Sequence, residues 1–465
     1  MTVSNIVTYA DLEAAGATER ARAAFVLDAV REYRTSRMYR EAASARSYFQ
    51  QRNETISRFA SILYRPDGEA VRDFTASQSR LASGIFRRLV MQRVMYSLGK
   101  GVSFVGTGDG GRDVTKERLG RRFDDDMKAV GVAAVSQGVA FPFWNLDHVD
   151  VFEATEFCPV WDDRSGALRA GVYFWRLDML HPFHAVLYEE DGYTEFCGED
   201  ASEASLRACA PKRAYVQRYE AVPADGLQLA VGEENWSRLP IVPVWGSDTK
   251  QSALVGVREG IDAYDLVKSG FANDVRDCAQ IYWLVENAGG MEDSDLERFR
   301  DRLRLMHIAA ADTSDGGAVT PFTQDVPFAA RAEILDRLKA DIYADFGALD
   351  VHTVAAGATN DHIDAAYQPM DEEADGFERH MREGIMDLLA LQGIEDTPVF
   401  VRNRVSNLKE QVEVVTMEAQ WLDDETILRK LPNVTPDEVQ EILGRSDEEA
   451  MERFAPLAAG RGAAE

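Results

Sequence analysis

The sequence lacks long apolar runs, and none reaches the roughly 18 residues that a membrane-spanning helix requires. Its first residues include acidic side chains and lack the basic stretch that begins a secretory signal peptide. Cysteine is scarce as well, and no two of the 4 cysteines form a C-x-x-C pair. We therefore expect an intracellular protein with no membrane partner, whose cysteines are isolated reduced thiols. These cysteines are Cys158, Cys197, Cys209 and Cys278.

Basic residues are also few relative to acidic ones. The chain has 51 Lys and Arg against 79 Asp and Glu, which gives a formal net charge of -28 at pH 7. Tight binding of nucleic acid by phosphate neutralisation needs a basic surface, so this balance argues against it. The balance is compatible with high solubility, or with a surface that must not adhere to a polyanion.

Catalytic fingerprints are missing too. The sequence has no G-x-S-x-G elbow, no H-E-x-x-H motif and no glycine loop that ends in G-K-[ST]. His181 and His184 are close together but have no evident third metal ligand. The acidic run Asp124–Asp126, with His148 or Asp150, leaves open a metal-dependent nuclease, although consecutive helical residues point in different directions. We expect no enzyme, and no catalytic, cofactor-binding or metal site.

The hydrophobic pattern changes along the chain and predicts a helix-rich α+β fold. Short strands separated by turn residues fill about 138–245, which is typical of an antiparallel or mixed sheet. The Pro-flanked strand Ile241–Trp245 should be an edge or terminal strand. From Ser252 to Asn287 the apolar residues keep the spacing of one long helix. Pro369 should kink a further helix over 363–391.

One connection is unusually long for a compact domain. Residues 349–362 are rich in Gly and Ala, with polar side chains interleaved, six of which lie in 352–362. Long connections without secondary structure are uncommon and are often functional. The segment is therefore either an ordinary helix–helix connection or the lining of a functional surface. The six polar residues of 352–362 are His352, Thr353, Thr359, Asn360, Asp361 and His362.

The order of these segments resembles that of the portal proteins of long-tailed bacteriophages. The most specific stretch is Leu239–Gly290, where a Pro-Ile-Val-Pro strand precedes Ile-Asp-Ala-Tyr-Asp and Ser-Gly-Phe-Ala-Asn-Asp. Weaker likeness lies in Tyr48–Arg58, Ile85–Phe104, Gly138–Asp147 and Val401–Val415. Each motif is weak alone, but their order is specific and covers nearly the whole chain.

The resemblance implies a portal fold with six further subdivisions after a mixed α/β wing. The wing would be 1–250, the long stem helices 251–290 and 328–348, and the small α/β clip 291–327. The tunnel loop would be 349–362, the kinked long helix with its return strand to the wing 363–405, and the short helical crown with a disordered tail 406–465. Ile261, Tyr264, Phe271 and Val275 would pack the stem.

The resemblance also implies a function. About twelve subunits would form a ring at one capsid vertex of the virion, assembled in the host bacterial cytoplasm. Double-stranded DNA would pass through its channel without sequence specificity, packaged by the terminase and later ejected. The six polar residues of 352–362 would line the channel. Major capsid and scaffold proteins would be further partners. The clip would meet the terminase large subunit and a head-completion or adaptor protein through Glu297, Arg298, Arg300, Asp301 and Arg304.

Elementary electrostatics is consistent with such a conduit. Basic side chains that bind DNA by releasing counterions would act as a brake, whereas an acidic wall keeps the duplex centred. Asp262, Asp265, Asp274 and Asp277 are expected at solvent or at this wall. A stem helix with neighbours on two sides would also explain apolar residues on several faces, as at Leu266. The nuclease, and a minor capsid protein without a channel, stay open as alternatives.

Overall fold

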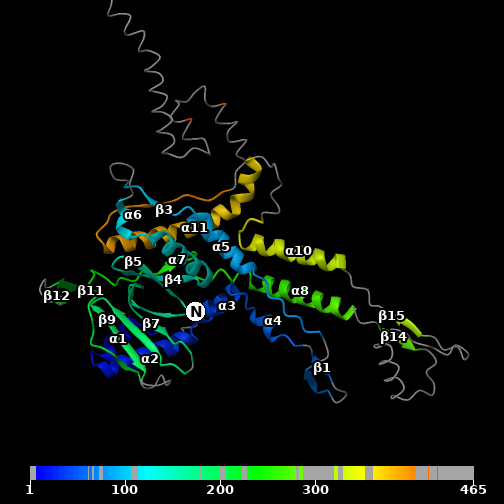
Figure 1. Cartoon of the computed structure of the whole chain (residues 1–465), viewed down its shortest axis with the longest axis horizontal. Helices are drawn as coiled ribbons and strands as arrows, with labels where there is room; N and C mark the ends of the chain where they lie inside the picture. The colour runs from blue at the N-terminus through cyan, green and yellow to red at the C-terminus, as the bar shows by residue number, and fades with distance from the viewer. Residues whose placement is uncertain are drawn as a thin grey trace, which may run out of the picture.

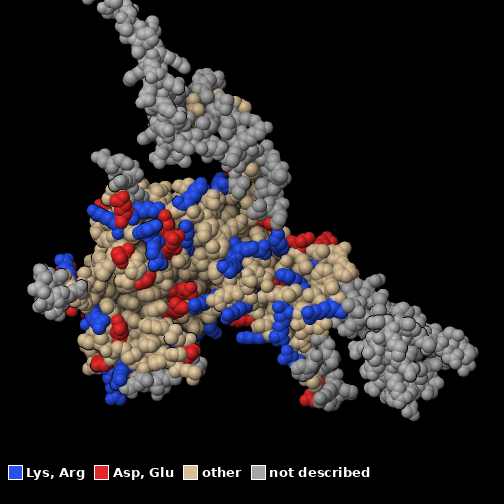
Figure 2. All heavy atoms as spheres, in the orientation of Figure 1, with Lys and Arg blue, Asp and Glu red and all other residues tan. Residues whose placement is uncertain are grey.

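The computed structural model has a mixed helical and sheet body from which two helices project (Figure 1). It describes residues 7–404 and the single residues 417 and 427. Gaps in the described range fall at 61, 65–67, 73–76, 107–113, 179, 199–205, 222–227, 279–281, 286–318, 323–327 and 351–359. Figure 2, in the same orientation, shows that both signs of charge are present on the face of the described residues that is in view. None of the described helices combines the length and apolar character needed to cross a membrane.

Three N-terminal helices pack beside a five-stranded antiparallel sheet. The helices are α1 (Tyr9–Ala15), α2 (Glu19–Thr35) and α3 (Arg37–Phe49). The strands run in the order β10-β9-β8-β7-β6. Their bounds are β6 Phe157–Trp161, β7 Leu168–Trp175, β8 His184–Glu189, β9 Gly192–Gly198 and β10 Leu206–Ala208. Val26 and Val30 of α2 are buried with Val172 and Leu187 of the sheet, so the predicted antiparallel sheet is confirmed.

A second, three-stranded antiparallel sheet has the order β13-β4-β5. The strands are β4 (Val139–Asn145), β5 (His148–Glu153) and β13 (Val244–Trp245). The Pro-flanked strand therefore lies at an edge, as predicted, although the central strand β4 also contains a proline, Pro142. Three two-stranded antiparallel sheets, β1-β2, β11-β12 and β16-β3, and two short helices are also present. They are α4 Glu54–Arg58, α6 Val114–Leu119, β1 Ile62–Tyr64, β2 Ala70–Arg72, β11 Val216–Ala221, β12 Gln228–Glu234, β3 Val102–Phe104 and β16 Pro398–Phe400.

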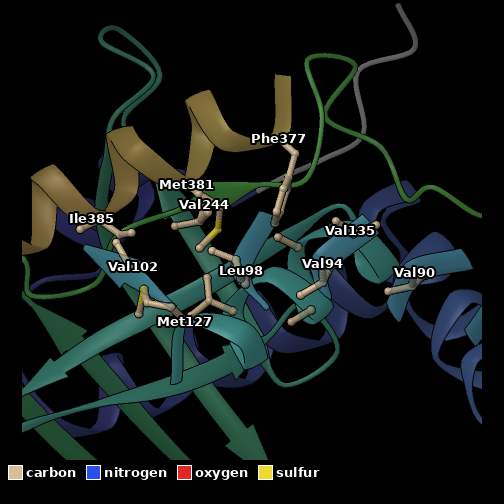
Figure 3. Packing of buried hydrophobic residues seen from close by; sticks show 14 of the residues in the cluster. Val90, Val94, Leu98, Val102, Met127, Val135, Val244, Phe377, Met381 and Ile385 are labelled. Atoms are coloured by element: carbon tan, nitrogen blue, oxygen red, sulfur yellow. The ribbon is translucent and has the colours of Figure 1, made fainter. Parts of the chain in front are cut away.

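The largest core joins segments far apart in the sequence. Helices α5 (Ile85–Leu98), α7 (Phe123–Gln137) and α11 (Asn360–Leu391) meet around fully buried side chains. Figure 3 shows Phe377, Met381 and Ile385 of α11 directed at Leu98 and Met127. A Cβ atom on Gly384 would lie 2.4 Å from Val244, so α11 approaches β13 closely only because this position is glycine.

The two projecting helices are α8 (Arg258–Cys278) and α10 (Phe328–Asp345). The single helix predicted over Ser252–Asn287, and the stem bounds 251–290, were too long. Residues 252–257 form turns, and Tyr282–Val285 is the strand β14, paired antiparallel with β15 (Val319–Phe322). A short apolar run such as 282–285 fits a strand as well as a helix, so hydrophobic spacing alone cannot distinguish the two.

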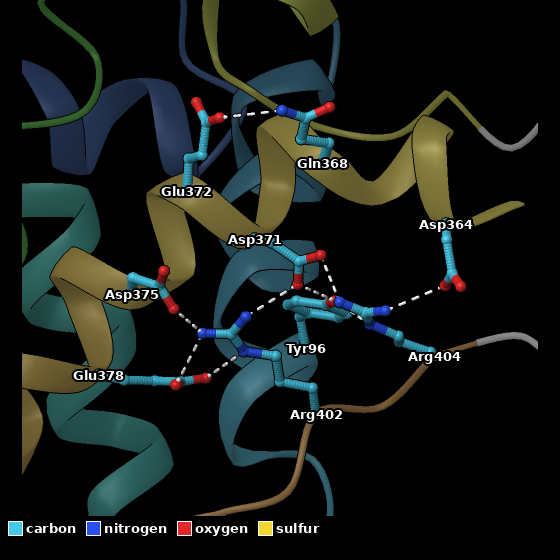
Figure 4. Close-up of polar contacts among 9 residues, drawn as sticks. All are labelled: Tyr96, Asp364, Gln368, Asp371, Glu372, Asp375, Glu378, Arg402 and Arg404. Atoms are coloured by element: carbon cyan, nitrogen blue, oxygen red, sulfur yellow. Dashed lines mark hydrogen bonds and ion pairs between the residues drawn. The ribbon is translucent and has the colours of Figure 1, made fainter. Parts of the chain in front are cut away.

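Two further predictions concern local constraints. Pro369 lies inside α11, and the first turns of that helix run in a different direction from the rest, as predicted (Figures 1 and 4). The prediction that the cysteines are isolated was wrong for one pair. Cys197 and Cys209 are disulfide-bonded with their Cα atoms 6.0 Å apart, because the pairing of β9 with β10 brings them together. Cys158 is a buried free thiol, whose pKa is raised by burial.

Candidate functional site

The helices α8 and α10 run antiparallel, and a small residue and two rings set their contact (Figure 1). Near the body, a Cβ atom on Gly260 would lie 2.9 Å from Cγ1 of Ile342, so glycine permits the close approach there. Farther out, the Phe271 ring packs edge-on against the Phe328 ring, with ring centres 5.6 Å apart. The pair is therefore packed near both of its ends.

An extended segment, residues 79–83, lies along one face of α8, and we call it the strap. Two residues of extended chain and four residues of helix each advance about 6–7 Å, so the two repeats match. The helix contributes an Asp-x3-Ser-x3-Asn spacing, but its partner lies 182 to 194 residues away, so the sequence did not reveal the match. Backbone N–H groups of Ser79, Leu81 and Ser83 donate to Asn273 Oδ1 (2.7 Å), Ser269 Oγ (3.0 Å) and Asp265 Oδ1 (2.9 Å).

The acids of α8 nearest the body do not face solvent or a channel, which corrects the expectation for two of them. Asp265 is fully buried, and it also accepts a 2.9 Å hydrogen bond from Asn53 Nδ2. Asp262 accepts hydrogen bonds from the Tyr48 hydroxyl at 2.5 Å and the Thr55 hydroxyl at 2.8 Å. Burial and this contact raise the pKa of Tyr48. Both carboxylates therefore fasten α8 to the body.

The predicted stem-packing residues differ in how far this chain alone buries them. Ile261 is buried in the main core, and Tyr264 packs against the same core. Phe271 is half-buried against Phe328. Val275 is 49% exposed, so no packing within the described chain accounts for its apolar side chain. Other large apolar side chains stand exposed on the same two helices, namely Leu266 on α8 and Phe328 and Ile334 on α10.

The structure moves part of the predicted tunnel loop into a helix. Asn360, Asp361 and His362 belong to the first turn of α11, so the connection is shorter than 349–362. Acidic residues near a helix N-terminus are favoured by the helix dipole, which is a physical reason for the earlier start. His352, Thr353 and Thr359 lie outside the described residues, as do all five predicted clip residues. Those five are Glu297, Arg298, Arg300, Asp301 and Arg304.

Charge on the projecting pair is mixed rather than uniformly acidic. Figure 2 shows Lys and Arg atoms along α8 and below it, and Asp and Glu atoms on the upper edge of α10. Asp274 of α8 forms an ion pair with Arg331 of α10, and Lys339 of α10 pairs with Asp350 at 2.9 Å. The helix pair is therefore not acidic on all sides, and the expected acidic wall can cover only one of its sides.

The acidic run at the start of α7 does not converge on a common point. Asp124 pairs with Lys116 at 2.7 Å and accepts the backbone N–H of Val102 at 3.0 Å. Asp125 is directed to Lys128, whereas Asp126 is buried, and burial raises its pKa. Within the described ranges, no three His, Cys, Asp or Glu side chains are grouped to hold a metal ion. The arrangement gives the nuclease alternative no support.

The two histidines that raised the question of a metal site also have separate partners. His181 Nδ1 lies 2.7 Å from Asp178 Oδ1 in the loop after β7. The His184 ring stacks on Trp175, with ring centres 5.2 Å apart. Neither ring is directed toward the other by these contacts.

Comparison with known proteins assigns the chain to a family. Residues 32–452 match the family described as Phage portal protein, SPP1 Gp6-like. The portal protein of Bacillus phage SPP1 is 25% identical over 434 residues, which are 85% of this chain and 80% of that protein. The portal protein of Clostridium phage phiCD119 is 28% identical over 218 residues, 45% of this chain and 48% of that protein.

Solved structures of a gene transfer agent (GTA) particle also resemble the chain. The neck of the empty particle has a TM-score of 0.46 at 11% identity, over 76% of this chain and 91% of that one. The virion of the native particle has a TM-score of 0.44 at 11% identity, over 76% and 90%. The family match alone spans most of the sequence, including both projecting helices and the segment between them. The chain therefore belongs to the SPP1 Gp6-like family of phage portal proteins.

Proposed function

We propose that this chain forms a closed ring of about twelve subunits at one capsid vertex, with a central channel for double-stranded DNA. The terminase drives DNA inward through this channel during packaging, and the same channel releases the DNA at ejection. The observation that carries the proposal is the exposed apolar surface on the α8–α10 pair. Its members are Leu266, Val275, Phe328 and Ile334, with exposed fractions of 40%, 49%, 54% and 49%.

Exposed apolar groups of this kind, rimmed by charged residues, are typical of protein–protein interfaces. Two different faces of the helix pair meet in a heterologous contact between neighbouring copies, and such contacts close into a ring when the rotation permits. In this proposal α8 and α10 are the stem, and the body formed by the two sheets and their helices is the wing. Packing between stems would bury the four side chains that one chain leaves exposed.

The channel needs no catalytic chemistry of its own. Portal proteins of this family are structural, and the nucleotide hydrolysis that moves DNA belongs in this proposal to the terminase. A net charge of -28 limits binding of the duplex, because a wall rich in basic side chains would hold the phosphates. Residues 349–359, the part of the predicted tunnel loop that precedes α11, are proposed to face the DNA.

The remaining partners follow from the same arrangement. Residues 291–327 are proposed to be the clip that meets the terminase large subunit and later a head-completion or adaptor protein. Residues 406–465 are proposed as the crown, which faces the capsid interior. Major capsid and scaffold proteins would surround the ring, which is assembled in the bacterial cytoplasm and retained in the virion.

The test is the state of the purified chain. Multi-angle light scattering should give a mass near that of about twelve subunits, and negative-stain images should show a ring with a central hole. A stable monomer at high protein concentration in packaging buffer would contradict the proposal. Closed particles without a hole would favour the minor capsid alternative.

A further inference from the structure

The bend of α11 is bridged by one side chain. Nη1 of Arg404 lies 3.1 Å from Oδ1 of Asp364, which precedes Pro369 in the helix. The other terminal nitrogen, Nη2, pairs with Asp371, which follows the proline. Figure 4 shows the Arg404 side chain between these two carboxylates. We call the residues before Pro369, Asn360–Gln368, the short arm of α11, and those after it the long arm.

Two tyrosines complete the contact around the proline. The Tyr96 hydroxyl donates a 2.6 Å hydrogen bond to Asp371 Oδ1 and accepts one of 2.8 Å from Nε of Arg404. Its ring stacks on the ring of Tyr367, with ring centres 5.6 Å apart. Burial, followed by the hydrogen bond to Asp371, raises the pKa of Tyr96 to about 12, so the donating proton stays in place at neutral pH.

A second arginine provides an internal comparison. Arg402 pairs with Asp371 at 2.9 Å and Glu378 at 3.0 Å, and also with Asp375. All three carboxylates lie on the long arm. Among the ion pairs of the described residues, Arg402 therefore contacts only one side of Pro369, whereas Arg404 contacts both.

The proline allows the bend but does not by itself fix its direction. Its missing N–H and the clash of its ring with the preceding turn remove the constraint that keeps a helix straight. The short arm is 9 residues, or about 13 Å. A swing of roughly 10–20° about the proline would move its first residue by about 2–5 Å. Contacts that span both arms hold Asn360 in one place: Ile363 and Tyr367 of the short arm are buried in one cluster with Met370 and Ala374 of the long arm, and Arg404 adds a charged bridge.

We propose that Arg404 is a positioning residue that sets the direction of the short arm, and with it the place where the segment before Asn360 joins the helix. This rests on the proposed function only in that the segment is taken to face the DNA channel. The bridge itself is independent of the ring, because Asp364, Asp371 and Arg404 belong to one chain.

Hydrogen exchange measured by mass spectrometry tests the bridge in the full-length protein. Arg404→Ala should speed amide exchange in 360–368 roughly three- to tenfold and leave 379–391 unchanged. The matched variant Arg402→Ala should leave 360–368 at the wild-type rate, although it also removes a partly buried ion-pair network. Equal acceleration of 360–368 in both variants, or no acceleration in either, would overturn the proposal.

A milder substitution serves as a second test in case Arg404→Ala prevents folding. Asp364→Asn removes only the negative charge of the Asp364 side chain and leaves Arg404 paired with Asp371. It should therefore reproduce the faster exchange in 360–368. Arg404→Lys keeps the charge but not the planar fork that reaches two carboxylates, so it should rescue exchange only in part. Wild-type exchange in Asp364→Asn would also overturn the proposal. Ring formation is scored separately by light scattering, so its failure would not be confused with failure of the bridge.

Discussion

The guanidinium carbon of Arg93 lies 4.3 Å from the centre of the Phe346 ring, and Nη2 of the same side chain donates a 2.6 Å hydrogen bond to the Phe346 carbonyl. One arginine of α5 thus binds both the ring and the backbone at the end of α10. It also pairs with Glu373 of α11 at 3.0 Å. Burial lowers the pKa of Arg93, and Glu373 partly offsets this. Three helices therefore meet at this side chain where the projecting pair leaves the body.

Replacing this arginine tests how firmly the pair is anchored. We expect Arg93→Ala to lower the free energy of unfolding by about 2–4 kcal/mol, because the Phe346 carbonyl and Glu373 lose a buried partner. Chemical denaturation monitored by circular dichroism would measure the change. Arg31→Ala is the control, since Arg31 is 72% exposed and its pair with Asp28 is on the surface. A similar, small effect in both variants would contradict the anchor.

The buried carboxylate of α8 provides a second test. Asp265→Ala would leave the Ser83 N–H and the Asn53 amide without their acceptor inside the protein. We expect a loss of about 2–3 kcal/mol in the free energy of unfolding, and faster amide exchange in the strap. Asp274→Ala removes a half-exposed ion pair on the same helix and should cost less than about 1 kcal/mol. Unchanged exchange at residues 79–83 would mean that this contact does not hold the strap.

Structural features that depend on proline or on residues nearby in the sequence could be predicted from the sequence. The edge position of the strand next to Pro240 and Pro243, and the bend of a helix at Pro369, were both predicted, because proline constrains its own backbone locally. Pro142 in the central strand β4 shows that this constraint alone does not decide where a strand lies in a sheet. The antiparallel sheets followed from alternating short strands, which also depend on neighbours in sequence.

Structural features that depend on contacts between residues far apart in the sequence could not be predicted from it. The apolar run Tyr282–Val285 extended the helical pattern, and only its pairing with Val319–Phe322 makes it a strand. Asp265 had the spacing of an exposed acid, and its burial depends on Asn53 and the strap. The residues next to an acid on a polar helix face do not indicate whether it has a partner about 200 residues away in the sequence. Pairwise contacts of this kind need the folded topology.

The proposed ring predicts that the apolar surface of the helix pair matters for assembly and not for folding. Ile334 is 49% exposed, so Ile334→Asp should leave the unfolding transition within about 0.5 kcal/mol of wild type. In the ring, the new charge would be buried against a neighbour, and light scattering should show smaller species. Leu180→Asp is a matched control, since Leu180 is 87% exposed on the loop before β8. Dissociation by Leu180→Asp alone would place the interface elsewhere.

Acid should loosen the bend of α11 through Asp371. Burial by itself would raise the pKa of this carboxyl, but hydrogen bonds from Tyr96 and Arg404 outweigh it and hold the pKa below its ordinary value of 3.8. A carboxyl with a lowered pKa contributes stability that is fully present above the ordinary value and is lost as the pH falls through the folded-state value. Amide exchange in 360–368, corrected for the intrinsic effect of pH, should therefore be constant from pH 7 to about pH 5 and should rise below about pH 4. Asp371→Asn should show the faster exchange at neutral pH and lose most of the acid dependence. An acid-induced rise of equal size in the wild type and in this variant would assign the effect to other carboxyls.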